Sequence, residues 1–139
     1  MDFIFDKDKL EEVQQIISLY KKFDRYKDNT REELYYHILP SIKLKQYKTF
    51  KENNKVIAFA NWAYLDNETE KQFINTGDFD NSAWNNGDKA WVIDVVSQGK
   101  GAKMVHWLRH KFNQVKWMRS DKNFKFYKIG KRNFNVKSS

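Results

Sequence analysis

Residues 91–102 read WVIDVVSQGKGA and are the most informative segment for the architecture. A run of aromatic and β-branched residues comes first and predicts a strand over residues 90–96. A turn containing Gly99 and Gly101 follows, and then a helix is expected over residues 102–113. Glycine lets backbone amides approach a ligand, and a helix start presents unpaired N–H groups and a positive dipole end. The stretch therefore predicts a strand, a turn able to bind an anion, and a helix.

Two helices are expected well before this stretch. Apolar residues at three- and four-residue steps predict a helix over residues 9–23. Thr30 and Glu33 stand at capping-box spacing, so a second helix should start at Arg31. Pro40 either kinks that helix or ends it.

The remaining segments predict a mixed α/β (α+β) domain. Gly and Pro are too few for a flexible linker, so residues 1–139 are expected to form a single domain with a mixed, mostly antiparallel sheet and flanking helices. The expected order is α-α-β-β-α-β-α-β-β. The further elements are hairpin strands at residues 46–50 and 56–65, a helix at 66–74, a loop at 76–89, and strands at 115–120 and 124–129.

Composition excludes several classes of protein. Aromatic residues make up 17% of the chain, which is too many for a disordered protein. The absence of Cys excludes a disulfide scaffold, a thiolate zinc site and a Cys nucleophile. No apolar run is long enough to span a membrane, and the N-terminus lacks the regions of a secretory signal. We therefore expect a cytoplasmic protein.

Positive charge is concentrated in the C-terminal third of the chain. Residues 100–139 carry 12 Lys and Arg and one acid, Asp121, whereas residues 1–99 carry 14 bases and 17 acids. Such a basic region attracts an acidic partner, which could be a nucleic acid, a lipid surface, a phosphorylated cofactor or an acidic protein.

The glycine turn resembles the acyl-CoA-binding turn of the GNAT acyltransferase fold, which reads Q/R-x-x-G-x-G/A. Gln98 and Gly101 match that pattern, whereas Lys103 stands where glycine or alanine is usual. The resemblance implies that the turn binds the acyl donor through Gln98, Gly99, Lys100, Gly101 and Lys103. The alternative is an ordinary strand-to-helix turn.

Five sequence blocks occur in a characteristic order: LPSI at residues 39–42, QY at 46–47, AFANWAYL at 58–65, GDKAWVID at 87–94 and LRHKF at 108–112. Together these blocks resemble the toxin-activating lysine acyltransferases, the hemolysin-activator-like proteins of bacterial RTX toxin operons. The resemblance covers about residues 17–121.

This resemblance implies a GNAT-like fold and a cytoplasmic enzyme that transfers a fatty acyl group from acyl carrier protein to lysines of a protoxin. The acceptor could also be a peptide bacteriocin, and the family allows a homodimer. No tightly bound cofactor is expected, because acyl-acyl carrier protein is the donor. Gly87 matches the glycine of the family's G-D pair, and Arg119 resembles the basic residue of an I-R-x-D segment.

The family's catalytic pair is a His after the first helix and an Asp at the end of the W-x-I-D strand. Asp94 matches that Asp, whereas Asp24 or Tyr26, depending on one gap, stands at the position of the His. His37, on the following helix, is the nearby imidazole. Three alternatives follow: His37 supplies the base, Asp24 does, or the protein binds a partner without catalysis.

Each of these residues also has a structural interpretation. His37 could be a half-exposed helix residue, and Asp94 could be a turn or N-cap acid. His106 and His110 have metal-ligand spacing without the glutamate of an H-E-x-x-H motif, so a solvated helix is expected and no metal is assigned. Trp84, in a loop, is expected to face a ligand.

The interleaved bases and aromatic residues of residues 116–132 would also suit a nucleic-acid-binding domain. We rank that alternative below the acyltransferase and the partner-binding relative, because no nucleic-acid motif accompanies it. A terminal β-hairpin with solvated lysines would produce the same pattern.

Overall fold

A computed structural model describes residues 5–112, 114–120 and 126–133. The predicted order α-α-β-β-α-β-α-β-β is confirmed, and a short 3-10 helix (Asn81–Ala83) lies before the third strand. Residues 121–125, which contain the connection expected between the last two strands, lie outside the described residues. The elements are α1 (Lys7–Tyr20), α2 (Arg31–Lys43), β1 (Tyr47–Glu52), β2 (Lys55–Leu65), α3 (Asn67–Thr76), β3 (Lys89–Ser97), α4 (Gly101–Lys111), β4 (Gln114–Ser120) and β5 (Phe126–Asn133).

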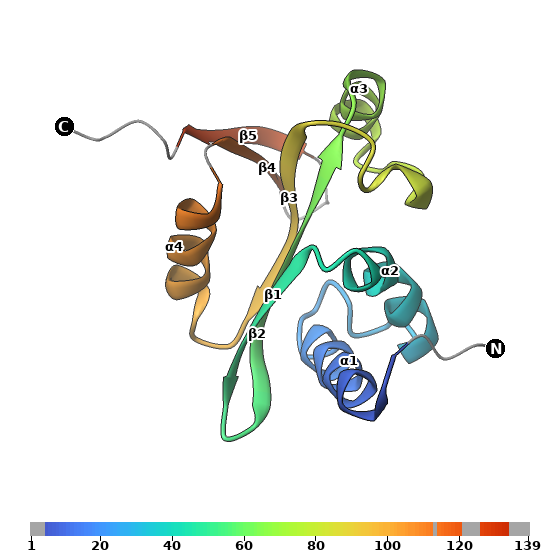
Figure 1. The fold of residues 1–139 in the computed structure, drawn as a ribbon, viewed down its shortest axis with the longest axis vertical. Helices are drawn as coiled ribbons and strands as arrows, with labels where there is room; N and C mark the ends of the chain where they lie inside the picture. Colours follow the sequence, from blue (N-terminus) through green and yellow to red (C-terminus); the bar gives the residue numbers. More distant parts are fainter. Residues whose placement is uncertain (1–4, 113, 121–125, 134–139) are drawn as a thin grey trace.

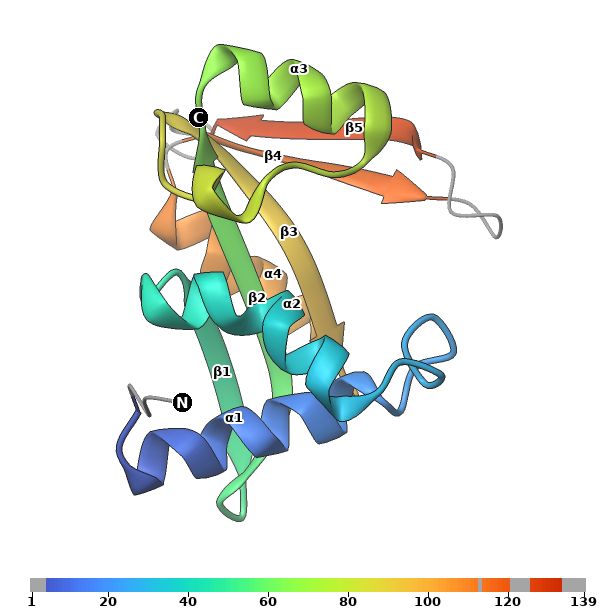
Figure 2. The same cartoon turned by 90° about the vertical axis from the view of Figure 1, so that its right-hand side faces the viewer.

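The described strands form a five-stranded sheet in the order β1-β2-β3-β4-β5. Neighbouring strands are antiparallel except β3 and β4, which are parallel and connected through α4. The sheet is therefore mixed and mostly antiparallel, as predicted. Strands β3 and β4 are paired at Trp91↔Lys116, and Figure 2 shows them diverging from each other.

Helices cover both faces of the sheet. Figure 1 shows α1, α2 and α3 on one side of the sheet and α4 on the other. Phe59 packs with α1 and α2, whereas Trp62 packs with Met104 and Leu108 of α4. Strand β2 is consequently buried on both faces, as its apolar sequence predicts.

A third cluster of buried residues lies under α3, where Trp84 packs with Phe73 and Trp91. Trp84 is only 5% exposed and also contacts Phe79. The expectation that Trp84 faces a ligand is wrong, because the 3-10 helix turns this loop residue inward to complete an aromatic cluster.

The N-terminal helices show the predicted capping and one difference in length. Thr30 and Glu33 form the capping box, so α2 begins at Arg31 as expected. Pro40 lies inside α2 and does not end it. Helix α1 ends at Tyr20, earlier than its apolar pattern suggests, because Phe23 and Tyr26 continue to pack on the core from a turn.

Gly87 sits where only glycine fits. A Cβ at this position would lie 2.2 Å from the carbonyl oxygen of Leu65 and 2.4 Å from the amide nitrogen of Asp66. These are backbone atoms, so they cannot rotate away. We expect Gly87→Ala to lower the free energy of unfolding by about 1–3 kcal/mol, the range for overpacking. Urea denaturation would measure the loss, and Gly101→Ala, where a Cβ meets open space, is the matched control.

Candidate functional site

A β-bulge places the Asp94 side chain beneath α1 and α2. Asn61 pairs with Asp94 and Trp62 pairs with Val92, so Ile93 is an extra residue on β3. Trp91 and Ile93 pack in the cluster under α3, on the same face of the sheet as α1 and α2. Strict alternation would then send Asp94 toward α4. The bulge returns it to the α1 and α2 face.

Three side chains from the described residues hydrogen-bond the Asp94 carboxylate. The Tyr20 hydroxyl donates to Oδ2 at 2.7 Å, and the Tyr26 hydroxyl donates to Oδ1 at 3.1 Å. His37 Nε2 lies 2.7 Å from Oδ2. The Asp94 side chain is only 8% exposed, whereas that of His37 is 40% exposed. The structure thus brings together the predicted residues His37 and Asp94, with His37 on the solvent side.

A buried polar chain fixes α2 relative to β3. The backbone N–H of Asp94 donates to Asn61 Oδ1 at 2.9 Å, and Asn61 Nδ2 donates to Ser41 Oγ at 3.0 Å. The Ser41 hydroxyl in turn donates to the carbonyl of Ile38. Asn61 and Ser41 are fully buried. Because a misaligned buried amide would be costly, this chain sets where α2 presents His37.

The charges of His37 and Asp94 stabilise each other. Burial alone would lower the pKa of His37, but the hydrogen bond to Asp94 and its negative charge outweigh burial and raise it. Burial would likewise raise the pKa of Asp94, yet the contacts with His37, Tyr20 and Tyr26 hold it below its ordinary value. Burial and the charge of Asp94 raise the pKa of both tyrosines, which therefore remain hydroxyl donors.

The hydrogen bond also selects one tautomer of neutral His37. A carboxylate can only accept, so Nε2 carries the proton and Nδ1 carries the free lone pair. None of the hydrogen bonds among residues 5–112 reaches Nδ1. The His37 side chain is partly exposed, so this basic nitrogen could take a proton from a group that approaches from solvent.

This pair predicts a pH dependence of stability. His37 has a raised pKa, so its contribution is complete below the unfolded value near 6.5 and is lost as pH rises through the folded pKa. Asp94 has a lowered pKa, so its contribution is complete above 3.8 and is lost as pH falls. We expect their joint contribution to be largest between these values. Thermal unfolding from pH 3 to 9 measures it, and the His37→Gln variant should lose the alkaline decline.

Asp24 is not brought to this site. Its side chain is 98% exposed and lies 3.7 Å from Lys27. The other occupant of the family's His position, Tyr26, is the one that contacts Asp94. We therefore do not retain Asp24 as a candidate base.

The glycine turn lies at the C-terminal end of β3, after Asp94. Gly99 has a φ of 81°, and α4 begins without a side-chain cap. The Lys100 amide donates to Ser97 Oγ, and the Lys100 ammonium is 3.3 Å from Glu52. Lys103 lies over the ring of Phe50. The turn thus leaves the first N–H groups of α4 available to an anion.

Arg119 is placed by its backbone on β4, beside Lys128 of β5. Across the β3–β4 junction, Lys116 and Trp91 both donate to Glu70 Oε2 at 2.7 Å.

On α4, His110 Nδ1 lies 2.9 Å from the carbonyl oxygen of His106. Among the described residues, no helix has the length and hydropathy needed to cross a membrane.

Sequence reasoning missed three residues of the site. Asn61 is a polar residue within the apolar run of β2. Buried polar groups need hydrogen-bond partners, so its position in the sequence indicates a buried hydrogen bond. Ser41 lies directly after Pro40, and nothing in the sequence pattern indicates its role. Tyr20 lies on the apolar face of α1, a position typical of a core residue, although a buried tyrosine hydroxyl also needs a hydrogen-bond partner.

Comparison with known proteins identifies the family. The model of the RTX toxin acyltransferase family matches residues 6–133. The chain belongs to this family. A leukotoxin-activating lysine-acyltransferase of Mannheimia haemolytica is 34% identical over 62 residues, covering 44% of this chain and 37% of that protein. The protein-lysine myristoyltransferase of Escherichia coli is 30% identical over 78 residues, covering 55% and 45%.

An uncharacterized protein of Synechocystis is 32% identical over 96 residues, covering 64% of this chain and 65% of that protein. The chain thus spans between about a third and two thirds of the curated relatives it matches.

Solved structures show the same fold. The loading GNATL domain of CurA from Lyngbya majuscula has a TM-score of 0.56 at 13% identity, covering 83% of this chain and 63% of that one. The GphF GNAT-like decarboxylase, solved with isobutyryl-CoA, has a TM-score of 0.54 at 7% identity, covering 81% and 64%. The GNAT-like fold expected from the sequence is confirmed.

Proposed function

We propose that this chain transfers a fatty acyl group from acyl carrier protein to lysine side chains of a protoxin or a related polypeptide. The observation that carries the proposal is the hydrogen bond between His37 Nε2 and the buried Asp94 carboxylate. Membership of the toxin acyltransferase family supports it, as do relatives named as protein-lysine acyltransferases.

In this proposal His37 is the general base. The neutral amine of the acceptor lysine attacks the carbonyl carbon of the donor thioester, and Nδ1 of His37 takes the proton that the nitrogen loses. The C–S bond then breaks, and the leaving thiolate takes that proton from the imidazolium. Asp94 holds the tautomer and stabilises the imidazolium, while Tyr20 and Tyr26 hold Asp94.

The glycine turn would bind the donor. Amides at Gly99 and Gly101 and the uncapped start of α4 suit an anionic group, with Gln98, Lys100 and Lys103 beside them. Arg119, on the neighbouring strand β4, is the further candidate for a contact with the donor. The donor is released afterwards, so no tightly bound cofactor is required.

A basic face on α4 and β1 favours an acidic carrier protein as the donor. Lys103 lies over Phe50, Lys48 lies over Trp107 and Phe50, and Lys111 lies over Trp62 and Trp107. These ammonium groups lie over aromatic rings, and none of the ion pairs within the described part of the chain includes them, so they can attract carboxylates. Such a donor would place the reaction in the cytoplasm.

Intact-mass analysis tests the proposal. The protein is incubated with acyl carrier proteins bearing different acyl chains and with a protoxin, alongside its His37→Gln variant. An acyl mass gain on the protoxin with wild type alone supports the proposal and names the chain length. A stable complex with acyl carrier protein but no mass gain would instead establish a partner-binding relative without catalysis. Sedimentation of the same samples tests for a homodimer.

A further inference from the structure

A surface pocket of about 320 Å³ lies between the outer side of α1 and the start of β2. Its lining includes Ser18 and Leu19 of α1, Lys22 just after that helix, and Lys55 and Val56 of β2. Leu19 and Val56 are buried and form an apolar floor. The pocket lies apart from His37 and Asp94, neither of which lines it.

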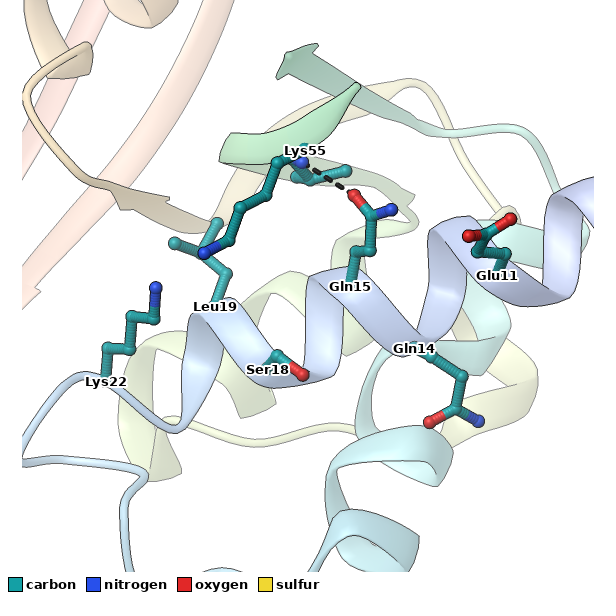
Figure 3. A pocket seen from close by; sticks show the side chains of 8 residues that line it. Glu11, Gln14, Gln15, Ser18, Leu19, Lys22 and Lys55 are labelled. Atoms are coloured by element: carbon teal, nitrogen blue, oxygen red, sulfur yellow. Dashed lines mark hydrogen bonds between the residues drawn. The ribbon is translucent and has the colours of Figure 1, made fainter. Parts of the chain in front are cut away.

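The two lysines of this pocket converge. Figure 3 shows the ammonium groups of Lys22 and Lys55 reaching toward each other over Leu19, while Glu11 lies at the other end of the pocket. The positive charge of Lys55 lowers the pKa of Lys22. None of the ion pairs among the described residues includes either ammonium group. Two like charges held together in this way favour an anion between them.

The pocket adjoins the glycine turn. Lys22 Nζ donates to the side-chain oxygen of Gln98 at 3.2 Å, and the backbone N–H of Gln98 donates to the backbone carbonyl of Ile57 at 2.9 Å. Lys100 forms an ion pair with Glu52 of β1, the strand that pairs with β2. A ligand held by the uncapped start of α4 would therefore have a second pair of cations beside it, contributed by a different part of the chain.

We infer that Lys22 and Lys55 bind a phosphate group. A phosphate has enough oxygens to accept from both ammonium groups at once, and charge-assisted bonds of this kind are the strong ones. Its source is either the phosphodiester of a donor's phosphopantetheine arm, which rests on the proposed function, or free phosphate, which does not.

Titration with inorganic phosphate, at ionic strength held constant with sodium chloride, tests the site directly. Amide signals of Ser18, Lys22 and Gln98 in two-dimensional NMR spectra should shift and saturate. Lys55→Gln should weaken the affinity by about tenfold or more, because one of two charge-assisted contacts is lost. Lys71→Gln, which removes an exposed lysine from α3, is the control of equal charge. Shifts that do not saturate, or equal affinity in both variants, would overturn the inference.

Thermal unfolding provides a second test of the phosphate site. Removing Lys55 also removes the repulsion of Lys22, so Lys55→Gln should unfold at a temperature no lower than wild type in phosphate-free buffer. Added phosphate should stabilise wild type and the Lys71→Gln protein but not Lys55→Gln. Equal stabilisation of all three proteins by phosphate would contradict the site.

The source of the phosphate is distinguished with 4′-phosphopantetheine. Tighter binding than inorganic phosphate, together with a raised KM and unchanged kcat for acyl transfer in Lys55→Gln, assigns the site to the donor. Equal affinities and an unchanged KM assign it to free phosphate. Saturable binding in a protein that transfers no acyl group would sustain this site while contradicting the proposed enzyme.

Discussion

The His37→Gln variant should transfer acyl groups about 10²–10⁴-fold more slowly than wild type, the range for loss of a general base. Glutamine can still donate to the Asp94 carboxylate, so the fold around the site should persist. It cannot take a proton, because its amide nitrogen has no basic lone pair. The rate of mass gain on the protoxin, measured with saturating donor, gives the loss in kcat.

The pH profile gives this prediction a sharper form. A base must be unprotonated, so the wild-type rate should rise with pH through a pKa that lies higher than 6.5, in addition to the rise at higher pH that comes from deprotonating the acceptor lysine. His37→Gln should lack that rise. His106→Gln removes an exposed imidazole from α4 and should keep both the rate and the profile. A His37→Gln protein with the wild-type rate and profile would exclude His37 as the base.

The Asp94→Asn variant should lose both activity and stability. The amide cannot stabilise an imidazolium, and its NH₂ group opposes one of the donors that Tyr20, Tyr26 and His37 now direct at the carboxylate. Each buried donor left unpaired costs about 1–3 kcal/mol of unfolding free energy, and the rate should fall by about 10²–10⁴-fold. Chemical denaturation and the mass assay measure the two effects separately.

Asp88→Asn is the matched control for that substitution. The Asp88 side chain is 93% exposed and contacts the neighbouring Lys89, so its replacement should change neither quantity. If Asp94→Asn were as stable and as active as Asp88→Asn, Asp94 would be an ordinary strand acid. If it were stable but inactive, the role of Asp94 would be in catalysis alone.

Local patterns determined most of the fold. The capping box at Thr30 and the apolar run of β2 each specify an element through nearest neighbours, and both are found where expected. The length of α1 was less predictable. Phe23 continues the apolar pattern after the helix has ended, because a turn can bury a side chain at the same spacing.

Only part of the site could be predicted, because its geometry depends on long-range contacts. His37 and Asp94 are 57 residues apart, and their meeting depends on how α2 packs over β3. The sequence could not separate Asp24 from Tyr26 at one position, since both are polar and both precede α2. Packing distinguishes the two residues. The Tyr26 ring packs edge-on against Tyr20, whereas the shorter Asp24 side chain is exposed to solvent.

Because of the bulge at Ile93, the site depends on the number of residues between Trp91 and Asp94. Between Trp91 and Asp94 the two intervening residues let Trp91, Ile93 and Asp94 share one face of the sheet. Gain or loss of a single residue there would change which face the acid occupies, even with every other residue kept. In an alignment of relatives, a one-residue gap inside W-x-I-D should therefore count as loss of the acid, as surely as a substitution does.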